Sequence, residues 1–430
     1  MVTSRLIFLA AWRCAAALLR SVQTAAFLLV LLVMPARLQA GSPPHGTAYR
    51  VGKLITMDDA DRVINNAVVL VQGKKIARVG SQQEVAVPDG YRVVNAKQLW
   101  LVPGLVDPHN HTAGSLMDLN DMVYLTNPGL RTLETIVPDN DIIRSARAGG
   151  VTSVLLIPGS GTNMSGFGTI AKTGGHTVED VVRRSPGSLK IAQAGNPEWY
   201  WFGVGRSYMN YNTRQTLLKA KAYHEKWNAF EQGKTKVKPL YDPIFDGFRG
   251  LFRGEYPVTV HTQIYQVVMT TIDMLAKKLG LHTVLDHSTF DGFKTAPLVL
   301  EQDLYTMNGP RQYWFDYSQR KMHGNAARWW QGGVKKLGIN TDAPVVPQKE
   351  LSYQAAMACW YGWLPYPALK GVTRIPAEAL QIDDHVGSIE VGKDADFGLW
   401  TGDPIDPRSS CELTVVRGTV VYDAKVKRRF

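Results

Sequence analysis

Eight apolar segments separated by stretches of helical character constrain the fold of this chain most. They lie at 101–107, 151–157, 167–171, 188–193, 256–261, 282–287, 304–308 and 335–341. Strands that alternate with helices favour a parallel sheet, and eight such strands predict an α/β (β/α)8 TIM-like barrel over residues 101–384. A long helix is also expected at 213–232, capped by Asn212 and Thr213, in an insertion between the fourth and fifth strands.

Short strands with turn residues between them flank this barrel on both sides. Four precede it, at 48–51, 67–71, 75–79 and 91–94, and three follow it, at 397–400, 413–416 and 419–422. We therefore expect residues 47–100 and 385–425 to form one small flanking β-sandwich. This domain would be built from both ends of the mature chain.

The first 40 residues are set apart from the fold by their composition. They contain four arginines, no acidic residue and the apolar run 25–34, which is too short to span a bilayer. We expect a signal peptide cleaved near Ala40 and a periplasmic or secreted protein, with an uncleaved membrane-anchoring signal as the alternative. Removing the four arginines lowers the formal net charge from +11 to +7. The remaining basic residues are scattered, which argues against a nucleic-acid partner.

Polar residues that suit a metal ion stand at the ends of several predicted strands. His109 and His111 end the first strand and, because side chains alternate along a strand, leave it on the same face. His261, His287 and Asp342 end the fifth, sixth and eighth strands. The C-terminal strand ends of a barrel form its active site, and histidine with aspartate is a donor set suited to zinc. These residues predict a metal centre.

Two segments make the chain resemble the amidohydrolase superfamily of metal-dependent hydrolases, in its imidazolonepropionase-like and dipeptidase-like branch. Residues 101–111 (LVPGLVDPHNH) are similar to the first-strand signature of that family, and residues 386–396 (VGSIEVGKDAD) to its return to the small β domain. The resemblance implies that His109, His111 and Asp342 bind one divalent metal ion. It implies that His261 and His287 bind a second.

A second ion would need a bridging ligand, for which Lys190 on the fourth strand is our candidate. A buried lysine beside cations has a lowered pKa, so its neutral amine can react with CO2 to form a carbamate. Related chains sometimes have a glutamate a few positions later, where Gly195 stands here, and Glu198 is a weaker substitute for it. Lys172 is a third candidate. The sequence leaves open whether the site holds one or two ions.

The predicted activity is hydrolysis of a C–N bond in an amide, peptide or cyclic amide. A metal-activated water would attack, and Asp342 would act as general base and then general acid. Deamination is the alternative reaction, although Ile264 occupies the position where single-metal deaminases of this superfamily have a glutamate. A non-catalytic barrel that only binds a ligand is the other alternative.

Three residues outside the metal set are candidates for contact with a small-molecule substrate. Asn163 lies in the glycine-rich loop 159–166, Trp199 follows the fourth strand, and Arg311 follows the seventh. An arginine there would pair with a substrate carboxylate. The substrate itself, the oligomeric state (a homo-oligomer is one option) and a disulfide between Cys359 and Cys411 are not determined by the sequence.

Overall fold

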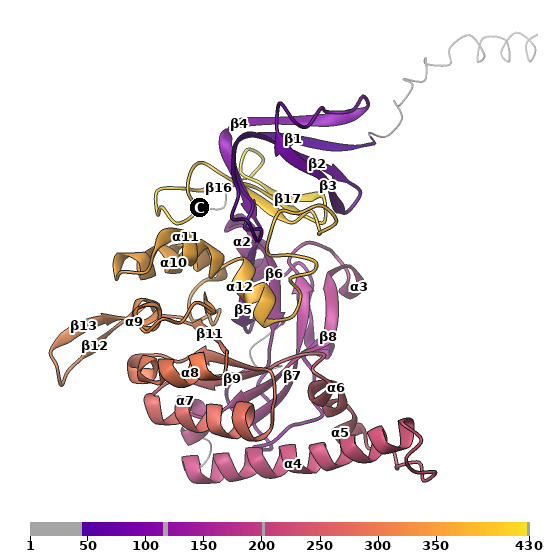
Figure 1. The fold of residues 1–430 in the computed structure, drawn as a ribbon, viewed down its shortest axis with the longest axis vertical. Helices are drawn as coiled ribbons and strands as arrows, with labels where there is room; N and C mark the ends of the chain where they lie inside the picture. Colours follow the sequence, from indigo (N-terminus) through magenta and orange to yellow (C-terminus); the bar gives the residue numbers. More distant parts are fainter. Residues whose placement is uncertain (1–44, 115–118, 200–202, 428–430) are drawn as a thin grey trace, which may run out of the picture. The chain divides into compact units, whose positions relative to one another are not determined.

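The apolar run that begins the predicted barrel is divided between two sheets in the computed structural model (Figure 1). Strand β4 (Tyr91–Pro103) belongs to a smaller sheet, whereas β5 (Leu105–Asn110) begins the barrel, so the predicted strand 101–107 is two strands. Gly104 separates them, and a Cβ atom there would lie 2.1 Å from the hydroxyl of Thr152. The close approach of the two sheets therefore requires glycine. The structure describes residues 45–114, 119–199 and 203–427.

The barrel contains a strand at each of the eight predicted places. These are β5, β6 (Val151–Leu156), β7 (Met164–Lys172), β8 (Val182–Ala192), β9 (Val258–Thr262), β10 (Thr283–His287), β11 (Tyr305–Asn308) and β14 (Leu337–Ile339). They form one sheet in the order β14-β11-β10-β9-β8-β7-β6-β5. The two outer strands meet where the backbone N–H of Asp342 donates to the carbonyl of His109 at 3.1 Å. The sheet is thus nearly closed, as expected for a barrel.

Strand β7 departs from the predicted all-parallel sheet. It runs antiparallel to both β6 and β8, whereas the other neighbouring pairs are parallel. A parallel connection needs about a dozen residues or more, and only residues 157–163 join β6 to β7. The prediction was wrong at this strand because the connection is too short for a crossover. The C-terminal end of β7 therefore lies at the opposite end of the barrel from those of its neighbours.

Helices and short helical turns connect the strands. They are η1 (Thr132–Thr135), α2 (Asp141–Ala148), α3 (Val178–Val181), η2 (Asn196–Trp199), α4 (Arg206–Glu231), α5 (Pro243–Asp246), α6 (Phe248–Arg253), α7 (Tyr265–Thr271), η3 (Ile272–Lys278), η4 (Phe290–Thr295), α8 (Ala296–Glu301), α9 (Asn325–Gln331), η5 (Gln348–Glu350), α10 (Leu351–Trp360), α11 (Pro365–Lys370) and α12 (Arg374–Ala379). Helix α4 begins seven residues before the predicted start, after the N-cap residue Gly205. Asn212 and Thr213 are thus interior helix residues, and both donate to the side chain of Asn163.

Both ends of the folded chain contribute to the smaller sheet. Its order is β17-β16-β15-β4-β1-β2-β3, with β1 (Gly46–Ile55), β2 (Val63–Gln72), β3 (Lys75–Ser81), β15 (Phe397–Trp400), β16 (Cys411–Val416) and β17 (Thr419–Asp423). Strand β4 joins the two halves, because it pairs with β1 on one side and with β15 on the other. These seven strands form a single sheet. The sandwich of two layers stays a prediction.

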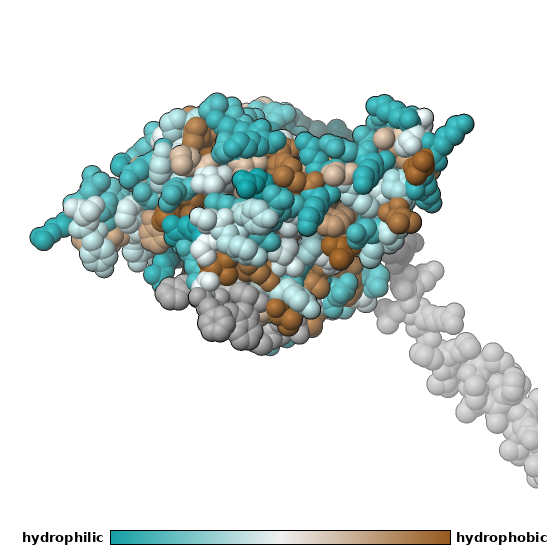
Figure 2. All heavy atoms as spheres, turned by 90° about the horizontal axis from the view of Figure 1, so that it is seen from below, coloured by the Kyte–Doolittle hydropathy of each residue, from teal (hydrophilic) through white to brown (hydrophobic). Residues whose placement is uncertain are grey.

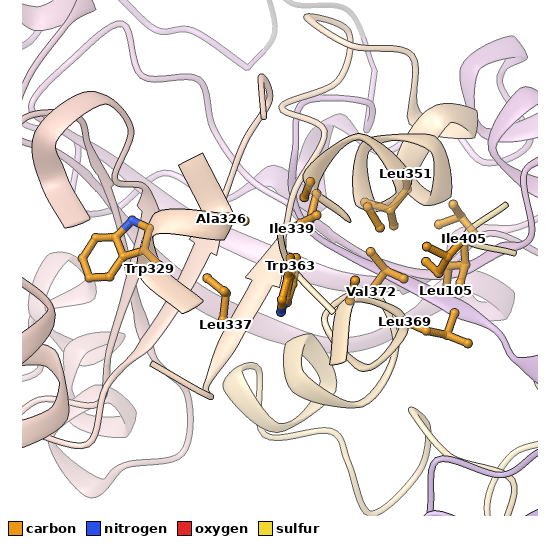
Figure 3. Close-up of a cluster of buried hydrophobic side chains, with 14 of the residues drawn as sticks. Leu105, Ala326, Trp329, Leu337, Ile339, Leu351, Trp363, Leu369, Val372 and Ile405 are labelled. Carbon is orange, nitrogen blue, oxygen red and sulfur yellow. The ribbon is translucent and has the colours of Figure 1, made fainter. Parts of the chain in front are cut away.

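The largest apolar cluster lies between the barrel and the helices that follow it. Figure 3 shows Leu105 of β5 beside Leu351, Leu369 and Val372 of the C-terminal helical region, with Ile339 of β14 nearby. All five are buried, and the cluster fixes the two strands that close the barrel. Elsewhere the surface in Figure 2 is largely hydrophilic with separate hydrophobic patches. Cys359 and Cys411 are both free thiols.

Candidate metal and catalytic site

Three side chains from distant parts of the sequence converge at the C-terminal ends of the barrel strands. One ligand atom from each of His109, His287 and Asp342 lies within 4.8 Å of the other two. His287 and Asp342 adopt left-handed backbone conformations, with φ of 60° and 49°. Such backbone is costly for residues other than glycine and is concentrated at functional sites. The structure therefore supports the predicted convergence of these three residues.

Hydrogen bonds to backbone carbonyls orient two of the histidines. Nδ1 of His287 donates to the carbonyl of Gly309, and Nδ1 of His111 donates to that of Ile157, both at 3.0 Å. A carbonyl can only accept, so each neutral ring carries its lone pair on Nε2. Nε2 of His287 is buried without a hydrogen-bond partner, and Nε2 of His111 lies 3.1 Å from a carboxylate oxygen of Asp342. Two acceptors facing each other require a proton or a cation, so these residues fit a metal ion.

Burial and mutual proximity perturb the titration of these groups. Burial lowers the pKa of His287 to about 3, and His109 adds to this effect. Burial also lowers the pKa of His261 well below its ordinary value, with His287 contributing. For Asp342, burial acts to raise the pKa, but contacts with His287, His109 and His111 hold it well below its usual range. His287 and His261 are thus neutral imidazoles beside an ionised carboxylate, the protonation states that bind metal.

Two buried aspartates that the sequence reasoning missed support this arrangement. Asp286 lies 2.7 Å from Nδ1 of His109, and its only sequence signal was its place directly before His287. Burial and Lys190 act to lower the pKa of His109, but the contacts with Asp286 and Asp342 raise it above its ordinary value. Asp107 accepts hydrogen bonds from Thr341 and Gln348, which ties β5 to the turn bearing Asp342. Burial raises the pKa of Asp107 to about 6.

Lys190 lies in the site beside the first histidine. Its Nζ is 3.2 Å from Nε2 of His109, and the side chain is fully buried. Burial lowers the pKa of Lys190 to about 8, while Asp286 and Asp342 act in the opposite direction. The structure thus places Lys190 beside one of the candidate metal ligands, and its role as a bridging ligand stays a prediction. Its carboxylation stays a prediction.

His261 lies next to this group on strand β9. Its ring centroid is 4.4 Å from that of His287, and its Nδ1 is 3.0 Å from the hydroxyl of Ser160. A Cβ atom on Gly195 would lie 3.1 Å from Nε2 of His261, so a larger residue there would face this histidine. The structure groups His287 with His109 and Asp342, whereas the resemblance had paired it with His261.

The other two candidates for a bridging ligand are engaged elsewhere. Lys172 ends the antiparallel strand β7, at the opposite end of the barrel, and contacts Asp396 at 2.6 Å. The carboxylate of Glu198 accepts from the backbone of Gly195 and from Arg206. Lys172 therefore lies away from the site, and the expectation for Lys172 was wrong. The role of Glu198 stays a prediction.

A pocket of about 410 Å³ opens beside the site. Its lining includes His261, His287 and Asp342 at one part of the wall and Arg311 at another. Arg311 is therefore placed where it can meet a substrate. Asn163 has its amide occupied by the Ala192 carbonyl, Asn212 and Thr213, and it does not line this pocket. Trp199 ends η2, but its side chain lies outside the described part of the structure.

Comparisons with known proteins agree with this geometry. The Amidohydrolase family model matches residues 261–426. The amidohydrolase tasK of Hapsidospora irregularis is 23% identical over 410 residues, which cover 83% of this chain but only 40% of that protein. The imidazolonepropionase of Pseudomonas entomophila is 24% identical, over 79% of this chain and 88% of that protein.

A solved structure extends the likeness to almost the whole described fold. An amidohydrolase from Thermotoga maritima MSB8 superimposes with a TM-score of 0.78 at 26% identity, covering 88% of this chain and 100% of that chain. The resemblance seen in residues 101–111 and 386–396 is thus confirmed along the length of the barrel. The chain is therefore similar to amidohydrolases in sequence over residues 261–426 and in fold over 88% of its length.

Proposed function

We propose that this protein is a metal-dependent hydrolase that cleaves a C–N bond in an amide, peptide or cyclic amide. The observation that carries the proposal is the convergence of His109, His287 and Asp342, with ligand atoms within 4.8 Å of one another, where His287 and Asp342 line a pocket of about 410 Å³. Two imidazoles and one carboxylate form a donor set typical of catalytic zinc.

The candidate ligands of the site would suit two metal ions. His109, His287 and Asp342 would hold the first, with His111 beside Asp342, and His261 and Lys190 are available for another. A divalent cation held here would supply Lewis acidity, which polarises a carbonyl and lowers the pKa of water. Burial lowers the pKa of Lys190 to about 8, which favours the neutral amine that can form a carbamate.

Asp342 is the residue suited to move protons. Its carboxylate is ionised and lines the pocket, so it is placed to accept a proton from the attacking water. The protonated carboxyl can then deliver this proton to the leaving nitrogen. Asp342 is also the least buried of the three converging residues and lines the pocket, which gives substrate access to it.

Deamination and simple ligand binding are less well supported. Position 264 is an isoleucine that precedes α7, and no glutamate lines the pocket among the described residues. The site therefore lacks the proton donor expected of a single-metal deaminase. Against a barrel that only binds an organic ligand, the buried and unpartnered Nε2 of His287 lies among the other candidate metal ligands, where a cation would satisfy it.

We also propose that the protein is exported and acts on a small molecule. The basic, then apolar, segment 1–40 supports a cleaved signal peptide, and it lies outside the residues that the structure describes. None of the helices in the described part is long and apolar enough to cross a bilayer. The pocket has the size of a small-molecule site.

The test is hydrolysis by zinc-loaded protein of a panel of dipeptides, N-acyl amino acids and cyclic amides. Asp342→Asn should lower kcat/KM at least about a thousandfold, because the proton acceptor is lost. The exposed Asp384→Asn provides a matched control and should keep full activity. Full activity of Asp342→Asn would contradict its role. Ammonia release from aminated heterocycles, with no hydrolysis of any amide, would favour the deaminase.

A further inference from the structure

The wall of the pocket opposite the metal candidates is aromatic and carries one cation. It is formed largely by the hairpin β12 (Tyr313–Asp316) and β13 (Lys321–Gly324), which extends from the barrel in Figure 1. This hairpin is an insertion between barrel strands β11 and β14. Its residues are the part of the pocket least required by the barrel itself, so they are suited to selecting the substrate.

The two faces of the hairpin have different environments. On one face Trp314 stacks on its cross-strand partner His323, with ring centroids 5.2 Å apart, and meets Phe290 edge-on. On the other face the cross-strand pair Phe315 and Met322 is 41% and 45% exposed, and both side chains line the pocket. The first face anchors the hairpin while Trp314 also borders the pocket, and the second presents the more exposed apolar surface to whatever enters.

Arg311 supplies the charge of this wall. It precedes the hairpin, lines the pocket and is exposed, and no carboxylate of the described chain lies within ion-pair distance of it. Its backbone is fixed, because the amide of the buried Asn325 donates to the Arg311 carbonyl at 2.7 Å. A guanidinium held at a pocket wall without a protein partner is suited to binding a carboxylate in two parallel hydrogen bonds.

Asn325 adds a second polar group that lacks a partner. It is 3% exposed and lines the pocket, and its Oδ1 has no hydrogen-bond partner in the described structure. The Arg311 carbonyl occupies the amide nitrogen, which identifies the free atom as the acceptor. A buried acceptor without a partner is costly, and an N–H group of a ligand would satisfy it.

We propose that the substrates of this site are amides that carry a free carboxylate next to an aromatic side chain, such as N-acylated aromatic amino acids. This assignment rests on the proposed hydrolysis. Arg311 would bind the carboxylate, Phe315 and Met322 would hold the ring, and Asn325 would accept the amide N–H. Water would add to the acyl carbon and the C–N bond would break, giving a carboxylic acid and the amino acid.

A binding experiment tests this assignment without requiring turnover. Calorimetry on zinc-loaded protein compares 3-phenylpropionate with 3-phenylpropanol, which keeps the ring but lacks the carboxylate. Arg311→Ala should weaken binding of 3-phenylpropionate about tenfold to a hundredfold and change that of 3-phenylpropanol less than about twofold. Arg311→Lys should recover part of the loss. Phe315→Ala should weaken both probes about equally, by roughly tenfold.

Controls separate the proposed contact from other ways of binding a carboxylate. Arg320→Ala removes an exposed arginine of the same hairpin that does not line the pocket, and it should leave both affinities unchanged. If chelation of zinc abolishes 3-phenylpropionate binding while Arg311→Ala has no effect, the carboxylate sits on the metal and the assignment is wrong. Equal losses for both probes in Arg311→Ala would overturn it as well.

Kinetics then distinguish a failure of this assignment from a failure of the proposed function. N-acetyl-L-phenylalanine should have a kcat/KM at least about tenfold above that of N-acetyl-L-phenylalaninamide, and Arg311→Ala should remove the preference. Hydrolysis without any preference would refute the substrate class and leave the hydrolase intact. Selective binding without hydrolysis of any panel member would refute the hydrolase and retain Arg311 as a carboxylate site.

Discussion

Two buried lysines on neighbouring barrel strands have opposite surroundings. Lys172 on β7 contacts Asp396 at 2.6 Å, Asp394 at 3.4 Å and the hydroxyl of Ser153 at 3.1 Å. Lys190 on β8 has no carboxylate of the described chain within ion-pair distance and contacts His109 instead. A buried charge normally has a partner, so an unpaired one indicates a group that function requires.

The direction of β7 explains why the two lysines differ. Because β7 is antiparallel, Lys172 aligns with Ser153 near the start of β6, whereas Lys190 aligns with Thr259 on the parallel strand β9. Lys172 therefore faces the smaller sheet, where Asp394 and Asp396 precede β15. Lys172 thus belongs to the junction of the two sheets, whereas Lys190, one strand away, belongs to the candidate site.

The largest expected effect in this comparison is on activity. Lys190→Met should lower kcat/KM by about a thousandfold, because the candidate bridging ligand is lost while the apolar side chain fills the space. The free energy of unfolding, measured in urea, should not fall, since a buried charge without an ion-pair partner is removed. If Lys190→Met keeps its activity, Lys190 has no functional role in the site.

The matched change at the other lysine should affect stability instead. Lys172→Met leaves Asp394 and Asp396 buried with one cation fewer, which should cost about 3–5 kcal/mol of unfolding free energy. The kcat/KM of the folded enzyme should stay within about twofold of the wild type. Urea unfolding with activity assays below the transition measures both quantities. A large loss of kcat/KM in fully folded Lys172→Met would contradict a purely structural role for Lys172.

The pH dependence of stability sharpens the contrast. The pKa of Lys190 is lowered from 10.5 to about 8 by burial, so between these values the unfolded chain binds a proton that the folded chain does not. The stability of chelator-treated wild type should therefore rise with pH from about 8 to 10.5, relative to Lys190→Met. The full gain is about 3 kcal/mol. Urea titrations at several pH values measure it, and a flat difference would place the pKa elsewhere.

The smallest expected effect concerns the hydroxyl beside Lys172. Ser153→Ala removes one buried hydrogen bond to the Lys172 amine and should cost about 1 kcal/mol of unfolding free energy. Activity should not change, because Ser153 lies at the far end of the barrel from the site. Ser188→Ala, which removes a buried hydroxyl contact to Thr259, serves as the control near Lys190. A loss of kcat/KM in Ser153→Ala as large as that in Ser188→Ala would contradict the assignment of Lys172 to the junction of the sheets and of Lys190 to the candidate site.

The sequence predicted the positions of the barrel strands because each is a buried apolar run. It did not predict their pairing direction at β7, although the short segment 157–163 contained that information. It also missed the break at Gly104, since apolar residues continue across it and only the contact with Thr152 in three dimensions reveals the constraint.

The sequence predicted which residues form the candidate site better than it predicted which of them lie together. His109, His287 and Asp342 were readable because polar side chains at strand ends stand out from apolar runs. Asp286 and Asp107 were missed, because a carboxylate inside a strand gives no periodic signal and becomes meaningful only through its partners. The hairpin that forms the pocket wall was not predicted either, as its short strands have few residues to show alternation.

The pairing of β4 with β15 has a consequence for biosynthesis. About 300 residues separate these strands, so during translation β4 emerges long before its partner exists. Until then the nascent chain exposes a 13-residue strand with a free edge, which is a template for association with other chains. Protection of this edge by a chaperone, or rapid completion of synthesis, is therefore expected to control the yield of soluble protein.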